Sequence, residues 1–190
     1  GKDIRKEPIS VSPGIHYFMG GIRVDAQHRT GVHNLYAAGE CCALYHGANR
    51  LGGNSLLGAL YGGRVAAQTA CAEAESASKR AVSIQPNDTV LPCESQDKAE
   101  LNRVLFHALG VVRSGETMQD ALTKISPMHG SLPLLGQAVL KSALARQESR
   151  GAHWRSDYPQ RNDAEFRKTT AVYYDGQTIH ISWDAVPERR

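Results

Sequence analysis

The sequence lacks the features that mark membrane, secreted or disulfide-built proteins. No run of about 18 apolar residues occurs, so we expect no membrane-spanning helix. No N-terminal stretch joins a basic start to an apolar core and a small-residue cleavage site, so we expect no signal peptide. Cysteine is scarce, with 4 in 190 residues, and Cys41 and Cys42 are adjacent. Such cysteine usage argues against a disulfide scaffold and favours a reducing, cytoplasmic compartment.

Strong charge and the common signatures of metal sites and nucleophilic catalysis are also missing. The net charge of +3 is small and the basic residues are scattered, so we expect no nucleic-acid partner. Cys41 and Cys42 with His46 fit no zinc-ligand spacing, so we expect no metal. Ser149 and His153 lie too close in sequence to give the geometry of a catalytic triad. We therefore identify no catalytic residue in this chain.

Glycine is concentrated in the first third of the chain, where 11 of the 18 glycines lie between residues 14 and 63. Such crowding predicts tight turns or a close approach of the backbone to another group. The composition of residues 15–24 and 35–40 predicts short strands. A helix is predicted from Leu56 to about Ala77, with Asn54 and Ser55 as caps. The glycines on its first turns predict that some group packs closely there.

The second half of the chain has helical periodicity followed by a hairpin pattern. After a linker at 81–96, apolar spacing predicts helices at about 97–112, 116–125 and 134–147. Short connections between them predict a three-helix bundle. Residues 150–168 are polar and predicted to be irregular, and two β-rich runs around Asp175-Gly176 predict a hairpin with a two-residue turn.

The glycine-rich stretch before Leu56 has a clear physical meaning. A loop rich in glycine ends at the start of a helix, where backbone N–H groups and the helix dipole favour negative charge. Arg50 adds a planar cationic fork suited to a carboxylate or phosphate, and His16 could supply another donor. The predicted ligand is an anion, or an electron-rich ring whose carbonyls accept hydrogen bonds.

Four motifs in a fixed order carry a family resemblance. They are HYFMGG at 16–21, LYAAGE at 35–40, HGANRLGGNSLL at 46–57 and ESRGAHWRSDYP at 148–159. Over roughly residues 8–170 the chain resembles the C-terminal part of the fumarate reductase/succinate dehydrogenase flavoprotein family, which includes L-aspartate oxidase. The resemblance implies FAD as cofactor, a small dicarboxylate as substrate and hydride transfer between the two.

The resemblance also implies roles for individual residues. His16 and Arg50 match residues that grip the substrate carboxylates, and Gly53 matches a backbone position near the same carboxylate. Glu40 matches the acidic residue that binds the ribityl or ribose hydroxyls of FAD. The positions that match those beside the isoalloxazine ring are Asn54, Ser55 and Leu56.

Departures from the family pattern set the expected fold and domain organisation. The sequence contains no GxGxxG pyrophosphate motif, and neither Arg23 nor Arg64 matches the proton-transferring arginine of the capping domain. We therefore expect an α/β fragment of a Rossmann-like FAD-binding domain at 1–80. It would be followed by a helical bundle at 97–163 and a C-terminal hairpin tail at 164–190.

Two hypotheses remain for the function. In the first, the chain is part of a dicarboxylate oxidoreductase, inactive alone and completed by a missing FAD-binding and capping region or a partner subunit. An iron–sulfur electron-transfer subunit is a further expected partner, and it would bring the protein to the cytoplasmic face of a membrane. In the second, the chain is a non-catalytic helical or assembly domain that binds a partner subunit but no flavin. Either way, residues 35–39 and 56–66 are expected to expose apolar surface.

Overall fold

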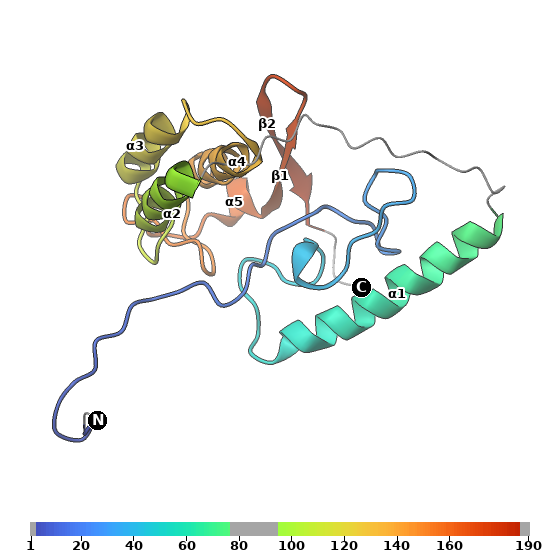
Figure 1. Cartoon of the computed structure of the whole chain (residues 1–190), viewed down its shortest axis with the longest axis horizontal. Helices are drawn as coiled ribbons and strands as arrows, with labels where there is room; N and C mark the ends of the chain where they lie inside the picture. The colour runs from blue at the N-terminus through green and yellow to red at the C-terminus, as the bar shows by residue number, and fades with distance from the viewer. Residues whose placement is uncertain (1–2, 77–94, 187–190) are drawn as a thin grey trace.

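The computed structural model of the protein describes residues 3–76 and 95–186. Figure 1 shows a long helix along one side of the molecule, three grouped helices on the other side and a hairpin beside them. The start of the chain runs away from the rest of the molecule, and the loops that follow it, up to the long helix, lie between these parts (Figure 1). Within the described ranges, no helix combines the length and the apolar character needed to cross a membrane. The elements are α1 (Asn54–Ser76), α2 (Ser95–Ala108), α3 (Gly115–Ile125), α4 (Ser131–Ala145), α5 (Asp163–Phe166), β1 (Lys168–Tyr174) and β2 (Ile179–Ala185).

The strands predicted at 15–24 and 35–40 are wrong. Residues 3–53 form loops, with one short 3-10 helix at Gly39–Cys41. The first segment makes a single bridge through Ile22, and the second a single bridge through Tyr36. Strand composition alone is insufficient, because a strand forms only where a neighbour supplies hydrogen bonds along its length.

Helix α1 confirms the predicted helix and explains two of its glycines. It begins at Asn54 itself, so this residue forms the first turn rather than preceding it. The group that packs closely is the ring of Tyr45. A Cβ at Gly58 would lie 3.1 Å from Cδ2 of Tyr45, and a Cβ at Gly62 would lie 2.8 Å from its Cζ. Gly63, by contrast, faces open space.

The predicted three-helix bundle is confirmed, with small shifts at the helix ends. Helix α2 ends at Ala108 rather than near 112, and Gly110 follows in a bend. Helix α4 begins at Ser131, ahead of the predicted start at 134, because Pro133 is tolerated in a first turn, where the backbone N–H has no helical partner. The core of the bundle consists of Leu101, Val104 and Ala108 from α2, Met118, Ala121 and Ile125 from α3, and Leu140 and Ala143 from α4.

The C-terminal hairpin is confirmed, but its two-residue turn is wrong. Strands β1 and β2 pair in antiparallel fashion, and the last pair joins Tyr174 to Ile179, which leaves four residues in the loop. Oδ1 of Asp175 accepts hydrogen bonds from the N–H groups of Gln177 at 2.9 Å and Thr178 at 2.7 Å. These hydrogen bonds to the Asp175 side chain satisfy backbone N–H groups of a four-residue loop, so the Asp-Gly pair does not form the two-residue turn that it predicts.

The segment predicted to be irregular at 150–168 contains the short helix α5. The side chain of Asn162 caps it by accepting a hydrogen bond from the N–H of Glu165 at 3.2 Å. The predicted linker at 81–96 lies mostly outside the described residues.

Candidate functional site

The loop that carries the HGANR motif lies against the first turns of α1. Tyr45, directly before the motif, packs on Gly58 and Gly62 of the helix. A pocket of about 320 Å³ opens beside this contact. Its walls are formed by Tyr45, His46, Asn54, Leu57, Gly58 and Tyr61. The pocket therefore sits at the N-terminal end of α1, where the sequence predicts ligand binding.

Arg50 is held at this end of α1 by an aromatic ring. Its guanidinium carbon lies 4.6 Å from the centre of the Tyr17 ring, a cation–π arrangement. Nη1 of Arg50 donates to the carbonyl of Leu51 at 3.3 Å. Nε of Arg50 and Nε2 of His46 are buried, and neither has a hydrogen-bond partner among the described residues. Arg50 is thus oriented by Tyr17 and keeps donor capacity for an acceptor.

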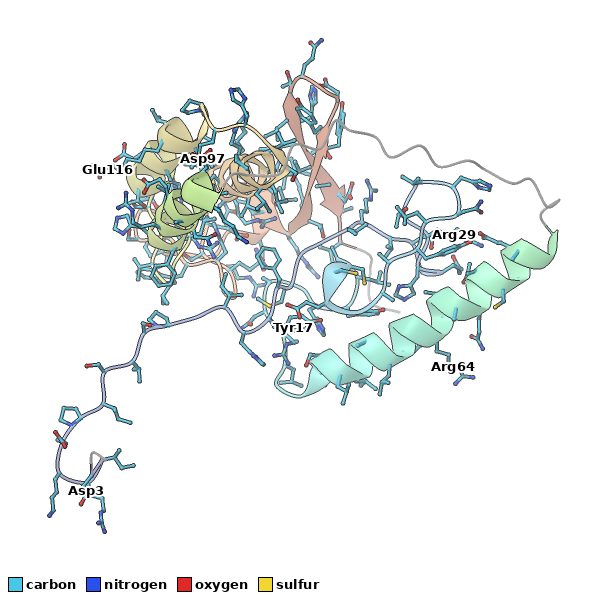
Figure 2. All side chains as sticks on the ribbon, in the orientation of Figure 1. Asp3, Tyr17, Arg29, Arg64, Asp97 and Glu116 are labelled. Carbon is cyan, nitrogen blue, oxygen red and sulfur yellow. The ribbon has the colours of Figure 1, made fainter. Side chains whose placement is uncertain are left out.

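Tyr17 also connects Arg50 to two other residues. Its ring centre lies 5.3 Å from that of His46 in an edge-on arrangement. Oε1 of Glu40 accepts a hydrogen bond from the N–H of Phe18 at 2.9 Å, which fixes the carboxylate beside Tyr17. Burial and then the charge of Glu40 raise the pKa of Tyr17, against the opposing effect of Arg50. Figure 2 shows Tyr17 close to the N-terminal end of α1.

The remaining predicted residues are less closely joined. His16 is exposed, and no hydrogen bond links it to Arg50 in the part of the chain that the structure describes. Gly53 directly precedes α1 with φ +85°, a backbone conformation that favours glycine. Asn54 and Ser55 are half-buried in the first turn, and Leu56 is exposed. The structure therefore groups Arg50 and Glu40 around Tyr17 and leaves His16 at the edge.

The surface at the start of α1 fits the ring of FAD. Four apolar or aromatic side chains of the first two turns, each more than half exposed, are Leu56, Leu57, Leu60 and Tyr61. An isoalloxazine ring is flat and largely apolar, with carbonyl acceptors at one edge. An exposed apolar face beside a helix N-terminus and the unpartnered Nε–H of Arg50 matches both properties.

The expected apolar exposure is therefore present at the start of the 56–66 segment. The same expectation is wrong for most of residues 35–39, since Ala37 and Gly39 are buried and only Leu35 is largely exposed.

Sequence reasoning missed the pair formed by the buried His28 and the half-buried Tyr45. Oη of Tyr45 lies 2.9 Å from Nε2 of His28, which is fully buried. His28 has φ 64°, a conformation that few residues other than glycine adopt. No motif or spacing signals this pair, because turn and loop meet only in the folded chain.

Comparisons with known proteins identify the family of this chain. Residues 1–56 match the sequence profile described as FAD binding domain, and residues 130–189 match the profile of the fumarate reductase flavoprotein C-terminus. L-aspartate oxidase from Rhodospirillum rubrum is 34% identical over 192 residues, covering 94% of this chain and 69% of that protein. This chain belongs to the fumarate reductase/succinate dehydrogenase flavoprotein family. The cofactor of the matched domain is FAD.

Solved structures of flavoproteins in the family share the fold. A quinol-fumarate reductase with menaquinol molecules gives a TM-score of 0.78 at 28% identity, covering 100% of this chain and 40% of that one. The Mycobacterium smegmatis Sdh1 complex in the apo form gives 0.77 at 28% identity, with coverages of 91% and 37%. The fumarate reductase flavoprotein subunit of Haemophilus influenzae is 35% identical over 209 residues, with coverages of 89% and 35%. The chain thus spans little more than a third of this relative's length.

Proposed function

We propose that this chain supplies the substrate-gripping side of a flavin site that interconverts a small dicarboxylate of the fumarate/succinate type. The observation that carries the proposal is the placement of Arg50, held on the ring of Tyr17 beside the N-terminus of α1. A planar guanidinium matches a carboxylate in shape and charge, so it both binds and orients the substrate. FAD, when bound, supplies the hydride chemistry.

Each of the other predicted residues has a part in the proposal. His16 would donate to a second substrate oxygen, and the N–H of Gly53 would meet the carboxylate that Arg50 binds. Glu40 would accept hydrogen bonds from hydroxyls of the FAD ribityl or ribose, while Asn54, Ser55 and Leu56 would meet the ring. The N-terminal N–H groups of α1 would stabilise negative charge on the ring, since they are already oriented and need no rearrangement.

The proposed activity needs more polypeptide than this sequence, because the sequence has no GxGxxG motif for the FAD pyrophosphate. The proposed completing parts are a further FAD-binding and capping region or a partner subunit, together with an iron–sulfur subunit that lies on the cytoplasmic face of a membrane. Within the chain, we propose three units at 1–80, 97–163 and 164–190. The names of the relatives, which include a flavoprotein subunit and a complex, support an assembly of this kind.

The test compares Arg50→Lys with Arg64→Lys in the FAD-loaded protein assembled with its completing parts. Arg64 is an exposed residue of α1 whose side chain points away from the rest of the molecule (Figure 2). Lysine keeps the positive charge but lacks the planar guanidinium, whose paired N–H donors match a carboxylate. We expect Arg50→Lys to retain the flavin absorbance band while its dicarboxylate-induced shift needs at least about tenfold more ligand. Arg64→Lys should match the wild type.

Two outcomes would contradict the proposal in different ways. A wild-type dicarboxylate response that Arg50→Lys leaves unchanged would remove Arg50 from the substrate site. A wild-type assembly that shows no flavin band at any FAD concentration would favour the non-catalytic assembly domain.

A further inference from the structure

A turn in the C-terminal third of the chain touches the loop that carries Arg50. The N–H of Ala152 donates to the carbonyl of Ala48 at 2.9 Å, and Ala48 lies two residues before Arg50. Gly151 has φ +57°, and a Cβ at this position would overlap the Ala48 carbonyl and lie 2.8 Å from its Cβ. The backbones approach so closely that only glycine fits at residue 151.

This contact ties the backbone of the loop to a distant part of the chain. Among the residues that the structure describes, it is the one backbone hydrogen bond that joins residues 46–53 to a segment distant in sequence. Gly47, Ala48 and Asn49 are exposed, so side-chain packing does little to fix them. The backbone position of the loop at Ala48 therefore depends on the turn that it contacts, while Tyr17 orients the side chains of His46 and Arg50.

The turn itself is closed by two backbone hydrogen bonds. The N–H of Arg150 donates to the carbonyl of His153 at 2.8 Å, and the N–H of His153 donates back to the carbonyl of Arg150 at 3.0 Å. Gly151 and Ala152 form the tip that meets Ala48. A two-residue turn closed at both ends has little freedom to move its tip.

A buried arginine ties the turn to the helical bundle. Arg155 is 2% exposed, and its Nη1 donates to the carbonyls of Leu144 at 2.9 Å and Arg146 at 3.2 Å, at the end of α4. Its Nε donates to Oδ1 of Asp157 at 3.0 Å, and Oδ2 of Asp157 accepts from the N–H of Gly115 at the start of α3. The turn thus moves with the bundle.

His153 supplies a second tie between the same parts. Nδ1 of His153 accepts a hydrogen bond from Nη1 of Arg113 at 2.9 Å, and its Nε2 donates to the carbonyl of Arg146 at 3.2 Å. Arg113 lies between α2 and α3, so the end of α4, the start of α3 and the connection between α2 and α3 all contact this region of the chain. The bundle therefore presents the tip at a fixed place.

We propose that Gly151 is a positioning residue for Arg50, the arginine that binds the substrate in the proposed function. Through Ala48, the helical bundle sets where the guanidinium of Arg50 stands relative to the N-terminus of α1, and hence how tightly the site holds a dicarboxylate. The inference rests on the proposed function, since it assigns a partner to Arg50. It gives the helical bundle a part in substrate binding without any contact between bundle and substrate.

The test is the Gly151→Ala variant in the FAD-loaded, fully assembled protein, with Gly176→Ala as the matched control. Gly176 has φ +99°, and a Cβ there would meet nothing within 4 Å, so alanine brings backbone strain without an overlap. We expect Gly151→Ala to weaken the dicarboxylate-induced flavin shift and to raise KM at least about tenfold, with FAD content unchanged. Gly176→Ala should keep the wild-type values.

Amide hydrogen exchange gives a readout that does not depend on activity. In the wild type the Ala152 amide should be protected, and in Gly151→Ala it should exchange at least about tenfold faster while the amides of α4 keep their protection. A second variant, Gly151→Asn, adds a Cβ of the same kind on a residue that tolerates positive φ. If Gly151→Ala folds poorly, Gly151→Asn takes its place, and we expect it to show the same loss of dicarboxylate affinity and of Ala152 amide protection.

Three outcomes would overturn the inference. Equal dicarboxylate affinity in Gly151→Asn and wild type would show that the contact does not position Arg50. Equal losses of dicarboxylate affinity in Gly151→Ala and Gly176→Ala would show that backbone strain alone, and not the contact with Ala48, causes the effect. A wild-type protein that binds FAD but no dicarboxylate would refute the proposed function and this role with it, whereas the first two results would leave the proposed function standing.

Discussion

The hydroxyl of Tyr45 lies 2.9 Å from Nε2 of His28, against the inner side of α1. Nδ1 of His28 lies 2.8 Å from the carbonyl of Ala37, so it donates there and leaves Nε2 to accept from Tyr45. Burial raises the pKa of Tyr45 to about 12, which keeps the hydroxyl protonated as a donor. This short chain of hydrogen bonds joins the turn at His28 to the loop that leads into the HGANR motif.

Replacing Tyr45 with phenylalanine should destabilise the fold. The change leaves Nε2 of the buried His28 without a partner, which costs about 1–3 kcal/mol. Urea unfolding followed by circular dichroism measures the loss. Tyr61→Phe is the matched control, because Tyr61 is 58% exposed and its change should stay within about 0.5 kcal/mol. Equal effects of the two variants would contradict the role of the pair.

Two neighbouring glycines of α1 should respond to alanine in opposite ways. A Cβ at Gly62 would lie 2.8 Å from Cζ of Tyr45 and 2.9 Å from Cε1 of His28, so Gly62→Ala should displace the ring and destabilise the protein by about 1–3 kcal/mol. Gly63 faces open space, and Gly63→Ala should stabilise the helix by up to about 1 kcal/mol. Thermal unfolding of both variants measures the two changes in stability. Changes of the same sign would refute the packing of Tyr45 on this helix.

Removing the carboxylate of Glu40 should weaken flavin binding more than neutralising it. Glu40→Gln keeps an oxygen for the N–H of Phe18 and for a ribose or ribityl hydroxyl, while Glu40→Ala keeps neither. We expect about a tenfold or greater loss of FAD affinity in Glu40→Ala, and a smaller loss in Glu40→Gln. Titration of the FAD-free protein, assembled with its completing parts, measures both affinities, and unchanged affinity in Glu40→Ala would show that Glu40 only supports the loop.

His153 should make the protein less stable as the pH falls below neutral. Burial lowers its pKa to about 4, and the charges of Arg113, Arg155 and Arg146 act in the same direction, against the hydrogen bond to the Arg146 carbonyl. Between about pH 6.5 and 4 the unfolded chain binds a proton that the folded chain does not. Stability is therefore unaffected above this window and declines as the pH drops through it.

The variant His153→Gln isolates this effect. It should show a smaller loss of stability between pH 7 and pH 4.5 than the wild type, measured by urea unfolding at each pH. The ion pair of Asp157 with Arg155 acts in another window, because hydrogen bonds from Arg155 lower the pKa of Asp157 to about 2. That contribution is lost only as the pH falls from about 4 towards 2. Parallel pH profiles for the two proteins would contradict the assignment to His153.

The sequence by itself determined the helices and the family. Helical hydrogen bonds and amphipathic spacing are local, so the periodicity of residues 97–147 was enough to predict the bundle. The glycines of α1 also predicted a close neighbour, although not that the neighbour is Tyr45. The ordered motifs around Arg50 and Gly151 identified the family before any geometry was known.

Only the tertiary structure decided which segments meet. Residues 15–24 and 35–40 have the composition of strands but form bridges at single positions, because strand formation depends on a neighbour rather than on the segment itself. The contacts of Tyr45 with His28 and of Ala48 with Gly151 leave no periodic signal for the same reason. Loop backbones are brought together by the packing of elements far apart in the chain, and the residues that allow such an approach are recognised only once both partners are in place.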